Sequence, residues 1–153
     1  MRVIKFLSLA FLVVFFIGCS TVVKSNDCLS QEASARALPG TKTAVVGIFL
    51  KSDGTPQETY KEVILHPGQR VVYAGPDRFS IIFKNKKTPN SKVDNESKNG
   101  VVIIDIPKDI FEKREFIEEF KKNKFLVFDY GISVNGKYYD PPIKVVPDDG
   151  TNL

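Results

Sequence analysis

The chain has 153 residues, a formal net charge of +4 and two cysteines, a length that suits one domain. Its first 18 residues contain two basic residues and no acid, so the remainder carries 20 basic against 18 acidic residues. This small basic excess argues against a nucleic-acid-binding module, and two cysteines are too few for a disulfide-rich scaffold.

The N-terminus has the organisation of a secretion signal. Arg2 and Lys5 form a short basic segment, and an apolar stretch follows from Phe6 to Ile17. As a helix this stretch would span about 18 Å, at roughly 1.5 Å per residue, which falls short of the ~30 Å hydrocarbon core of a bilayer. The pattern therefore predicts a signal peptide over residues 1–18 rather than a transmembrane helix.

The segment Phe16-Ile17-Gly18-Cys19 resembles the lipobox of bacterial lipoproteins, with phenylalanine where leucine is more common. The resemblance implies that a dedicated signal peptidase cuts before Cys19 and that fatty acids such as palmitate anchor this residue. Two or more acyl chains hold a protein stably on a membrane. Ser20 differs from the aspartate that resembles an inner-membrane retention signal. We therefore expect a lipid-anchored protein of the bacterial envelope, at the outer membrane where the organism has one.

Cys28 lies nine residues beyond the expected anchor. Lipidation of Cys19 would leave it as the odd cysteine of the chain, and odd cysteines in oxidising compartments often pair between chains. The sequence thus predicts an intermolecular disulfide through Cys28, either a disulfide-linked homodimer or a mixed disulfide. A free or capped thiol is the alternative.

Residues 19–42 are rich in Ser, Ala, Thr and Asn and are predicted to form a flexible linker. Apolar and β-branched runs predict strands over 44–50, 59–65, 70–73 and 79–84, with a type II turn at Pro67-Gly68 between two of them. Residues 85–99 contain a single aliphatic residue, Val93. They are predicted to be a long solvated loop, disordered rather than structured.

The remaining elements complete a β-rich pattern. A strand is predicted over 101–106, a helix over 107–122, and a long strand over 125–134 that ends in the hairpin signal Asn135-Gly136. Further strands follow over 137–139 and 143–146. Together these elements predict a mainly β fold, a Greek-key-type β-sandwich of about seven strands with one short helix. It would span residues 43–147, with a disordered tail over 148–153.

The turn and strand over 64–73 and the closing hairpin over 128–143 resemble segments of cupredoxin-like domains, and more broadly of immunoglobulin-like β-sandwiches. A blue copper site needs two histidines, a cysteine and usually a methionine. Here His66 is the single histidine, Met1 is the single methionine, and Cys28 falls in the linker. The resemblance therefore implies a copperless relative that holds neither a metal nor a cofactor.

The sequence offers little for catalysis. His66 is the only imidazole, and its place before Pro67 predicts an exposed turn residue. A carboxyl group needs burial to raise its pKa before it works as a general acid near neutral pH, and the sequence does not show burial. Asp148-Asp149-Gly150 lacks the spaced oxygens of a calcium loop. Four aspartates border apolar runs and are the candidates for acid–base chemistry: Asp105, Asp109, Asp129 and Asp140.

A binding surface is the stronger expectation. Tyr138 and Tyr139 are neighbours on a predicted strand, so their side chains point to opposite faces and one of them should be exposed. Lys86 and Lys87 make the long loop basic. We expect an envelope lipoprotein, not an enzyme, whose β-sandwich is a binding or assembly module for an envelope protein or a surface glycan. The alternatives are a pilotin-like structural accessory of an envelope machine and a small hydrolase.

Overall fold

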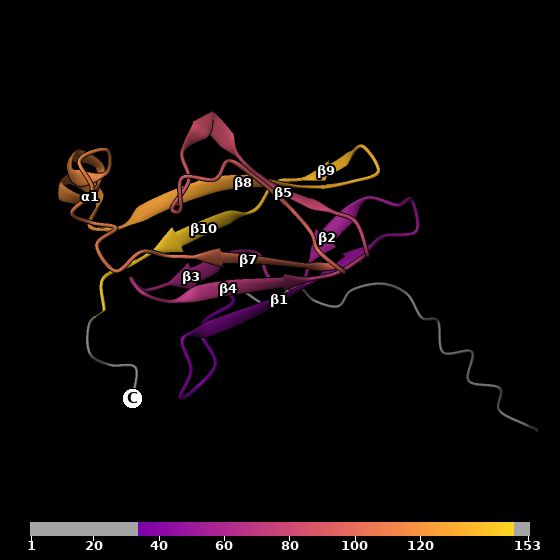
Figure 1. The fold of residues 1–153 in the computed structure, drawn as a ribbon, viewed down its shortest axis with the longest axis horizontal. Coiled ribbons are helices and arrows are strands. Elements are labelled where there is room, and N and C mark those ends of the chain that lie inside the picture. The colour runs from indigo at the N-terminus through magenta and orange to yellow at the C-terminus, as the bar shows by residue number, and fades with distance from the viewer. Residues whose placement is uncertain (1–33, 149–153) are drawn as a thin grey trace, which may run out of the picture.

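A computed structural model describes residues 34–148 of the chain. The predicted signal peptide, Cys19, Cys28 and the residues after 148 lie outside the described part, so the predictions made for them stay predictions. Within 34–148 the chain forms ten strands and one α-helix, and the strands stack as two layers (Figure 1).

The first sheet has the strand order β2-β1-β4-β7. Its members are β1 (Thr43–Leu50), β2 (Pro56–Glu58), β4 (Arg70–Ala74) and β7 (Val101–Asp105). β1 pairs with β4 in parallel, whereas β2 and β7 pair antiparallel with β1 and β4. In the described part of the chain, β2 and β7 are therefore the edges of this sheet.

The second sheet has the order β3-β10-β8-β5-β6, and β9 also pairs with β8. Its members are β3 (Val63–Leu65), β5 (Ser80–Phe83), β6 (Asp94–Glu96), β8 (Leu126–Val134), β9 (Lys137–Tyr139) and β10 (Pro142–Val145). The predicted mainly β fold, a β-sandwich with one short helix, is confirmed.

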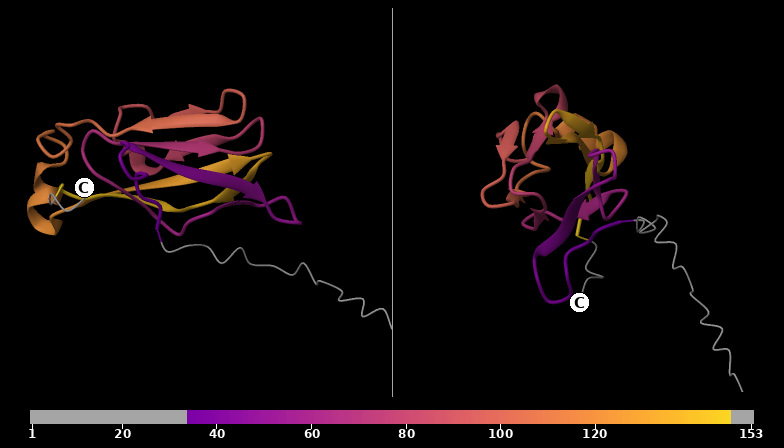
Figure 2. Two further views of the ribbon diagram at one scale, coloured as in Figure 1. Left: turned by 90° about the horizontal axis from the view of Figure 1, so that it is seen from below. Right: turned by 90° about the vertical axis from the view of Figure 1, so that its right-hand side faces the viewer.

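The core lies between the two sheets, and the end-on view in Figure 2 shows how the strands surround it. Alternation along each strand sends every second side chain inward, and the inward set is almost wholly aliphatic or aromatic. From the first sheet it includes Val46, Tyr73 and Ile104, and from the second Ile81, Phe128, Tyr130 and Ile132. Burial of these side chains supplies the main stabilisation of the fold.

The helix is shorter than predicted. α1 spans Ile117–Asn123 and lies at one end of the sandwich, whereas the preceding residues 107–116 form turns (Figure 1). Phe116 packs edge-on against Phe128, with 5.4 Å between ring centroids, and this contact holds the start of the helix on the core. Lys124 ends it in the left-handed conformation, with φ of 64°. Among residues 34–148, no helix is long and apolar enough to cross a membrane.

Both predicted turns are confirmed. Asn135 and Gly136 have φ of 50° and 79°, the left-handed pair that a type I′ hairpin requires. The Gln69 N–H donates to the His66 carbonyl at 3.1 Å across Pro67 and Gly68. Gly68 has φ of 80°, as expected at the third position of a type II turn.

The prediction of a disordered loop over 85–99 is wrong. The segment contains β6, and the side chains of Thr88 and Asn95 are buried. The Thr88 hydroxyl donates to the Lys92 carbonyl at 3.0 Å, and the Asn95 amide donates to the same oxygen at 3.1 Å. Hydrogen bonds from buried polar side chains therefore order residues 85–99, in place of the usual aliphatic packing. For this reason the polar composition of the segment wrongly predicted disorder.

The segment also ends in a second hairpin turn. Asn99 and Gly100 have φ of 52° and 73°, and backbone hydrogen bonds of 2.9 and 3.1 Å join Lys98 to Val101 on either side. This is the same Asn-Gly signal as at residues 135–136, and it leads directly into β7.

The predicted linker also differs from the structure in its described part. Ala35 is buried and pairs with Val63 beside β3. The Leu38 N–H donates to the Thr43 carbonyl at 2.9 Å, so the chain folds back before β1. Residues 34–42 are thus attached to the sandwich, whereas 19–33 lie outside the described residues.

Candidate functional site

The outer face of the first sheet carries a row of aliphatic side chains. Val45 of β1 lies opposite Val72 of β4, and Val72 lies opposite Ile103 of β7. Val45 and Ile103 are 45% and 48% exposed, and Val72 is half-buried. Ala74 and Val101 are paired two residues further along the same two strands and are also exposed. We call these five residues the aliphatic patch.

The aliphatic patch has a charged border and an open edge. Beyond one end, Arg70 forms an ion pair with Asp105 at 2.9 Å. Beyond β7, no further strand is present in the part of the chain that the structure describes. The patch is therefore continuous with an unpaired strand edge.

The hydrogen-bond pattern of β4 shows which groups of β7 point to that edge. The Arg70 N–H donates to Lys42 on the β1 side, whereas the Gly75 N–H donates to Gly100 on the β7 side. Backbone groups alternate between the two sides of a strand. Ile103, opposite Val72, therefore directs its N–H and C=O away from β4 and toward the open edge.

The sequence contains a signal for the aliphatic patch. Val45-Val46, Val71-Val72 and the run over 101–104 place aliphatic residues at consecutive positions of one strand. Because neighbouring side chains point to opposite faces, such runs predict a sheet that is apolar on both sides. In a two-layered sandwich only one of those sides meets the core.

The predicted binding residues are placed as follows. Tyr138 is 59% exposed, whereas Tyr139 is half-buried against the core, so the prediction that one of the pair is exposed is confirmed. Lys86 is exposed in the turn after β5. Lys87 is not available for a ligand, because its Nζ forms an ion pair with Glu119 at 2.6 Å and donates to the Val127 carbonyl at 2.5 Å.

These residues do not form one surface. Tyr138 pairs with Ser133 near the end of β8, whereas Lys87 contacts Val127 near its beginning. Six residues of extended strand separate the two positions, roughly 20 Å at 3.3 Å per residue. The tyrosine hairpin and the lysine turn thus lie toward opposite ends of the sandwich (Figure 1).

The prediction that His66 is exposed is wrong. Only 7% of its surface is accessible, because the β3–β4 turn folds it against the C-terminal segment. Its Nδ1 donates to the Pro147 carbonyl at 3.0 Å, and its backbone N–H donates to Gln69 Oε1 at 2.9 Å. The close return of the C-terminal segment is a tertiary contact that the local turn pattern does not contain.

The four candidate aspartates are all exposed. Asp105 pairs with Arg70, and Asp140 forms an ion pair with Lys84 at 3.0 Å. Neither these two nor Asp109 and Asp129 has the burial that a general acid needs.

The buried carboxyl group of the described chain is instead Glu58. Its side chain enters from β2 between the sheets and has no accessible surface. The Tyr130 hydroxyl of β8 donates to its Oε2 at 2.7 Å. Tyr73 of β4 completes the cluster, with its ring 5.6 Å from that of Tyr130 in an edge-to-face arrangement.

Burial raises the pKa of Glu58 to about 8, and the hydrogen bond from Tyr130 acts in the opposite direction. At neutral pH the group is therefore mostly an uncharged acid within the core. With no accessible surface, the Glu58 side chain is closed off from solvent in the described part of the chain. A carboxyl group that solvent does not reach fits a structural role. β2 is short and polar, so the sequence around Glu58 has no apolar pattern that would indicate its burial.

Among residues 34–148, no group of three or more His, Cys, Asp or Glu side chains is arranged to hold a metal ion. The chain matches no protein-family profile and no curated protein sequence.

Proposed function

We propose that this protein is a membrane-tethered docking module, which presents the outer face of its first sheet to another protein of the envelope. The observation that carries this proposal is the aliphatic patch, which lies in register across three strands and continues to the open edge of β7. Exposed apolar patches on a folded domain commonly mark interaction sites.

The chemistry of the patch favours a protein partner over a glycan. Val45, Val72 and Ile103 offer a flat hydrocarbon surface without hydrogen-bonding side chains. Such a surface gains free energy by excluding water from other apolar groups, at about 25 cal/mol per Å². A polysaccharide would present mainly hydroxyl groups to it and would lose their hydration.

The unpaired edge of β7 indicates which backbone conformation the bound segment of that partner would have. An extended segment that joins a sheet edge receives backbone hydrogen bonds and places alternate side chains on each face. Beside β7, such a segment would bond to the outward groups of Ile103 and extend the aliphatic row with its own apolar side chains. The partner we propose is therefore an extended segment with alternating aliphatic residues.

Tethering rests on the lipobox resemblance at Cys19. In the native host, Cys19→Ala should leave an uncut precursor and abolish labelling by a fatty-acid probe, because the acceptor thiol is gone. Unchanged labelling of this variant would refute the anchor, whatever the aliphatic patch does.

The docking proposal is tested with a matched pair of variants of the full-length protein in its native envelope. Ile103→Lys places a charge in the aliphatic patch, and Tyr138→Lys places the same charge on an exposed apolar residue of the distant hairpin. Co-isolation in mild detergent should lose a defined partner with Ile103→Lys and retain it with Tyr138→Lys. The reverse result would move the binding surface to the tyrosine hairpin and overturn the proposal.

A further inference from the structure

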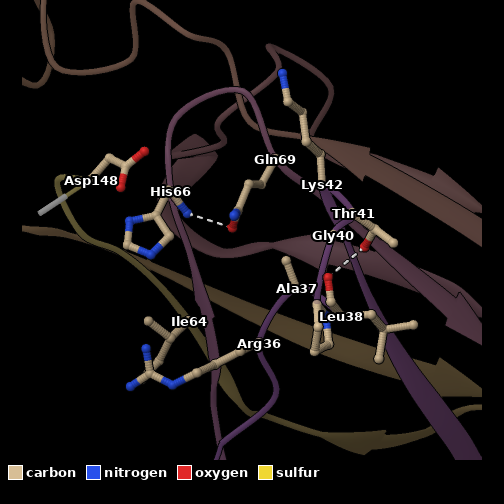
Figure 3. Close-up of a pocket in the computed structure, with 11 residues that line it drawn as sticks. Arg36, Ala37, Leu38, Gly40, Thr41, Lys42, Ile64, His66, Gln69 and Asp148 are labelled. Carbon is tan, nitrogen blue, oxygen red and sulfur yellow. Dashed lines mark hydrogen bonds between the residues drawn. The ribbon is translucent and has the colours of Figure 1, made fainter. Parts of the chain in front are cut away.

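A cavity of about 360 Å³ lies where the described chain joins the sandwich and where it leaves it (Figure 3). One wall is the segment before β1, and the other is the β3–β4 turn with the C-terminal segment. The volume falls within the range of small-ligand sites, roughly 300–1,000 Å³, at its lower end. The cavity is separate from the aliphatic patch, and none of its lining residues belongs to that patch.

Two tight turns fix the walls. Across Pro39-Gly40, the Thr41 N–H and hydroxyl both donate to the Leu38 carbonyl at 2.9 Å. Gly40 has φ of 68°, which a type II turn requires at this position. On the other wall, the turn that begins at His66 is held by its bond to Pro147. Polar groups on the cavity surface are therefore held in place before any ligand arrives.

The lining is rich in hydrogen-bond donors and in positive charge. Arg36 and Lys42 are exposed and form no ion pair with any residue that the structure describes, and they lie at the two ends of the wall formed by the segment before β1 (Figure 3). Gln69 uses Oε1 to accept the His66 N–H, which leaves its Nε2 group as a donor. Among the described residues of the lining, Asp148 is the single carboxylate.

Apolar side chains complete the surface. Ala37, Leu38 and Ile64 contribute hydrocarbon between the charged groups. A ligand that complements both the positive charge and the apolar side chains of the lining needs an anionic group, which binds Arg36, and a compact body, which covers the apolar side chains. Arginine binds carboxylate and phosphate oxygens in pairs, with geometry that a lysine cannot reproduce.

We propose that this cavity binds a small organic oxyanion, a carboxylate or phosphate ester of about monosaccharide size. The anionic group is held by Arg36 and the body of the ligand by the amide of Gln69, with Lys42 adding long-range attraction. Asp148 opposes the ligand charge and limits its affinity. This site is independent of the docking proposal, since it uses another part of the surface.

The test is an NMR titration of the full-length protein in detergent micelles with glucuronate, glucose 6-phosphate and, as the uncharged analogue, glucose. We expect saturable shifts of the Gly40, Thr41 and Gln69 amides with at least one of the two anions, at a Kd of about 1 mM or tighter. Glucose should shift them little. The two anions separate a carboxylate ligand from a phosphate ligand.

Three variants decide whether the cavity is responsible. Arg36→Gln should weaken binding about tenfold or more, and Asp148→Asn should strengthen it severalfold, because one removes attraction and the other repulsion. Lys61→Gln removes an equal charge from an exposed residue outside the cavity and should leave the Kd unchanged. The absence of saturable shifts with both anions, or equal binding by Arg36→Gln and the native protein, would overturn the proposal.

Discussion

Ile103 and Ile104 are neighbours on β7, yet one faces solvent and the other has no accessible surface. The same contrast holds across β1, β4 and β7, whose inner face packs on the second sheet while their outer face carries the aliphatic patch. Stability alone explains only the inner face. In a two-layered sandwich the outward residues are ordinarily polar, so the apolar outer face indicates a second requirement, which we assign to docking.

Glu58 shows the opposite placement, a polar side chain inside the core. A carboxyl group occupies the interior, where an aliphatic residue would serve, while aliphatic residues occupy the exterior. The core tolerates Glu58 because it is protonated at neutral pH and bonded to Tyr130. Substitutions that reverse each placement therefore have different expected effects on unfolding and on binding.

The largest effect is expected on the inner face. Ile104→Thr should lower the free energy of unfolding by about 4 kcal/mol, because it leaves a cavity and buries a hydroxyl group. Urea denaturation of the full-length protein in micelles measures this change. A loss under about 1 kcal/mol would mean that Ile104 is not part of a tightly packed core.

Glu58→Gln should change how stability depends on pH. The pKa of Glu58 is raised from 4.5 to about 8 on folding, so its contribution is fully present below pH 4.5 and is lost as pH rises toward 8. The Gln variant should unfold at the same or slightly lower denaturant concentration than the native protein at pH 4. At pH 9 it should be more stable by about 4 kcal/mol, given about 1.4 kcal/mol for each pKa unit between 4.5 and about 8 and a slight deficit of the Gln variant at pH 4. Parallel curves across this range would show that Glu58 is not held protonated.

The two Asn-Gly turns give a smaller, matched comparison. A Cβ at Gly100 would lie 2.7 Å from the Gly75 carbonyl oxygen, whereas a Cβ at Gly136 would meet nothing within 4 Å. Both alanine variants incur the left-handed backbone cost of about 1 kcal/mol. Gly100→Ala should therefore lose about 2–3 kcal/mol and Gly136→Ala about 1 kcal/mol of unfolding free energy. Equal losses would contradict the close packing that positions the start of β7.

The smallest effect is expected on the outer face. Ile103→Thr preserves the strand preference of a β-branched residue and should change the free energy of unfolding by under about 0.5 kcal/mol. Comparison with Ile104→Thr in the same denaturation experiment isolates the role of the two faces. A loss as large as that of Ile104→Thr would show that Ile103 is needed for folding, and the aliphatic patch would then need no partner to explain it.

Local patterns were sufficient for much of this fold. Alternating apolar residues predicted most strands, and Asn135-Gly136 predicted its hairpin with the correct backbone conformation. The equivalent turn at Asn99-Gly100 is not flanked by alternating apolar residues on both sides, because it follows a polar segment that is ordered by buried Thr88 and Asn95 rather than by aliphatic residues.

The functional surfaces depended on contacts that the sequence pattern does not contain. The burial of His66 follows from the return of Pro147, and that of Glu58 from packing between β2 and β8. The aliphatic patch needed the pairing of β1 with β4, which are separated in sequence by two other strands. Consecutive aliphatic residues predict a strand that is apolar on both faces. They do not predict which of the two faces remains exposed to solvent.

Photo-crosslinking in the native envelope tests the docking surface most directly. A photoreactive amino acid replaces Val45 or Ile103 in the aliphatic patch, and exposed Lys122 of α1 in the control. We predict one shared adduct from the two patch positions, absent from the Lys122 control and lost when Val72→Lys is added. No adduct at either patch position, or the same adduct from Lys122, would contradict docking through the outer face of this sheet.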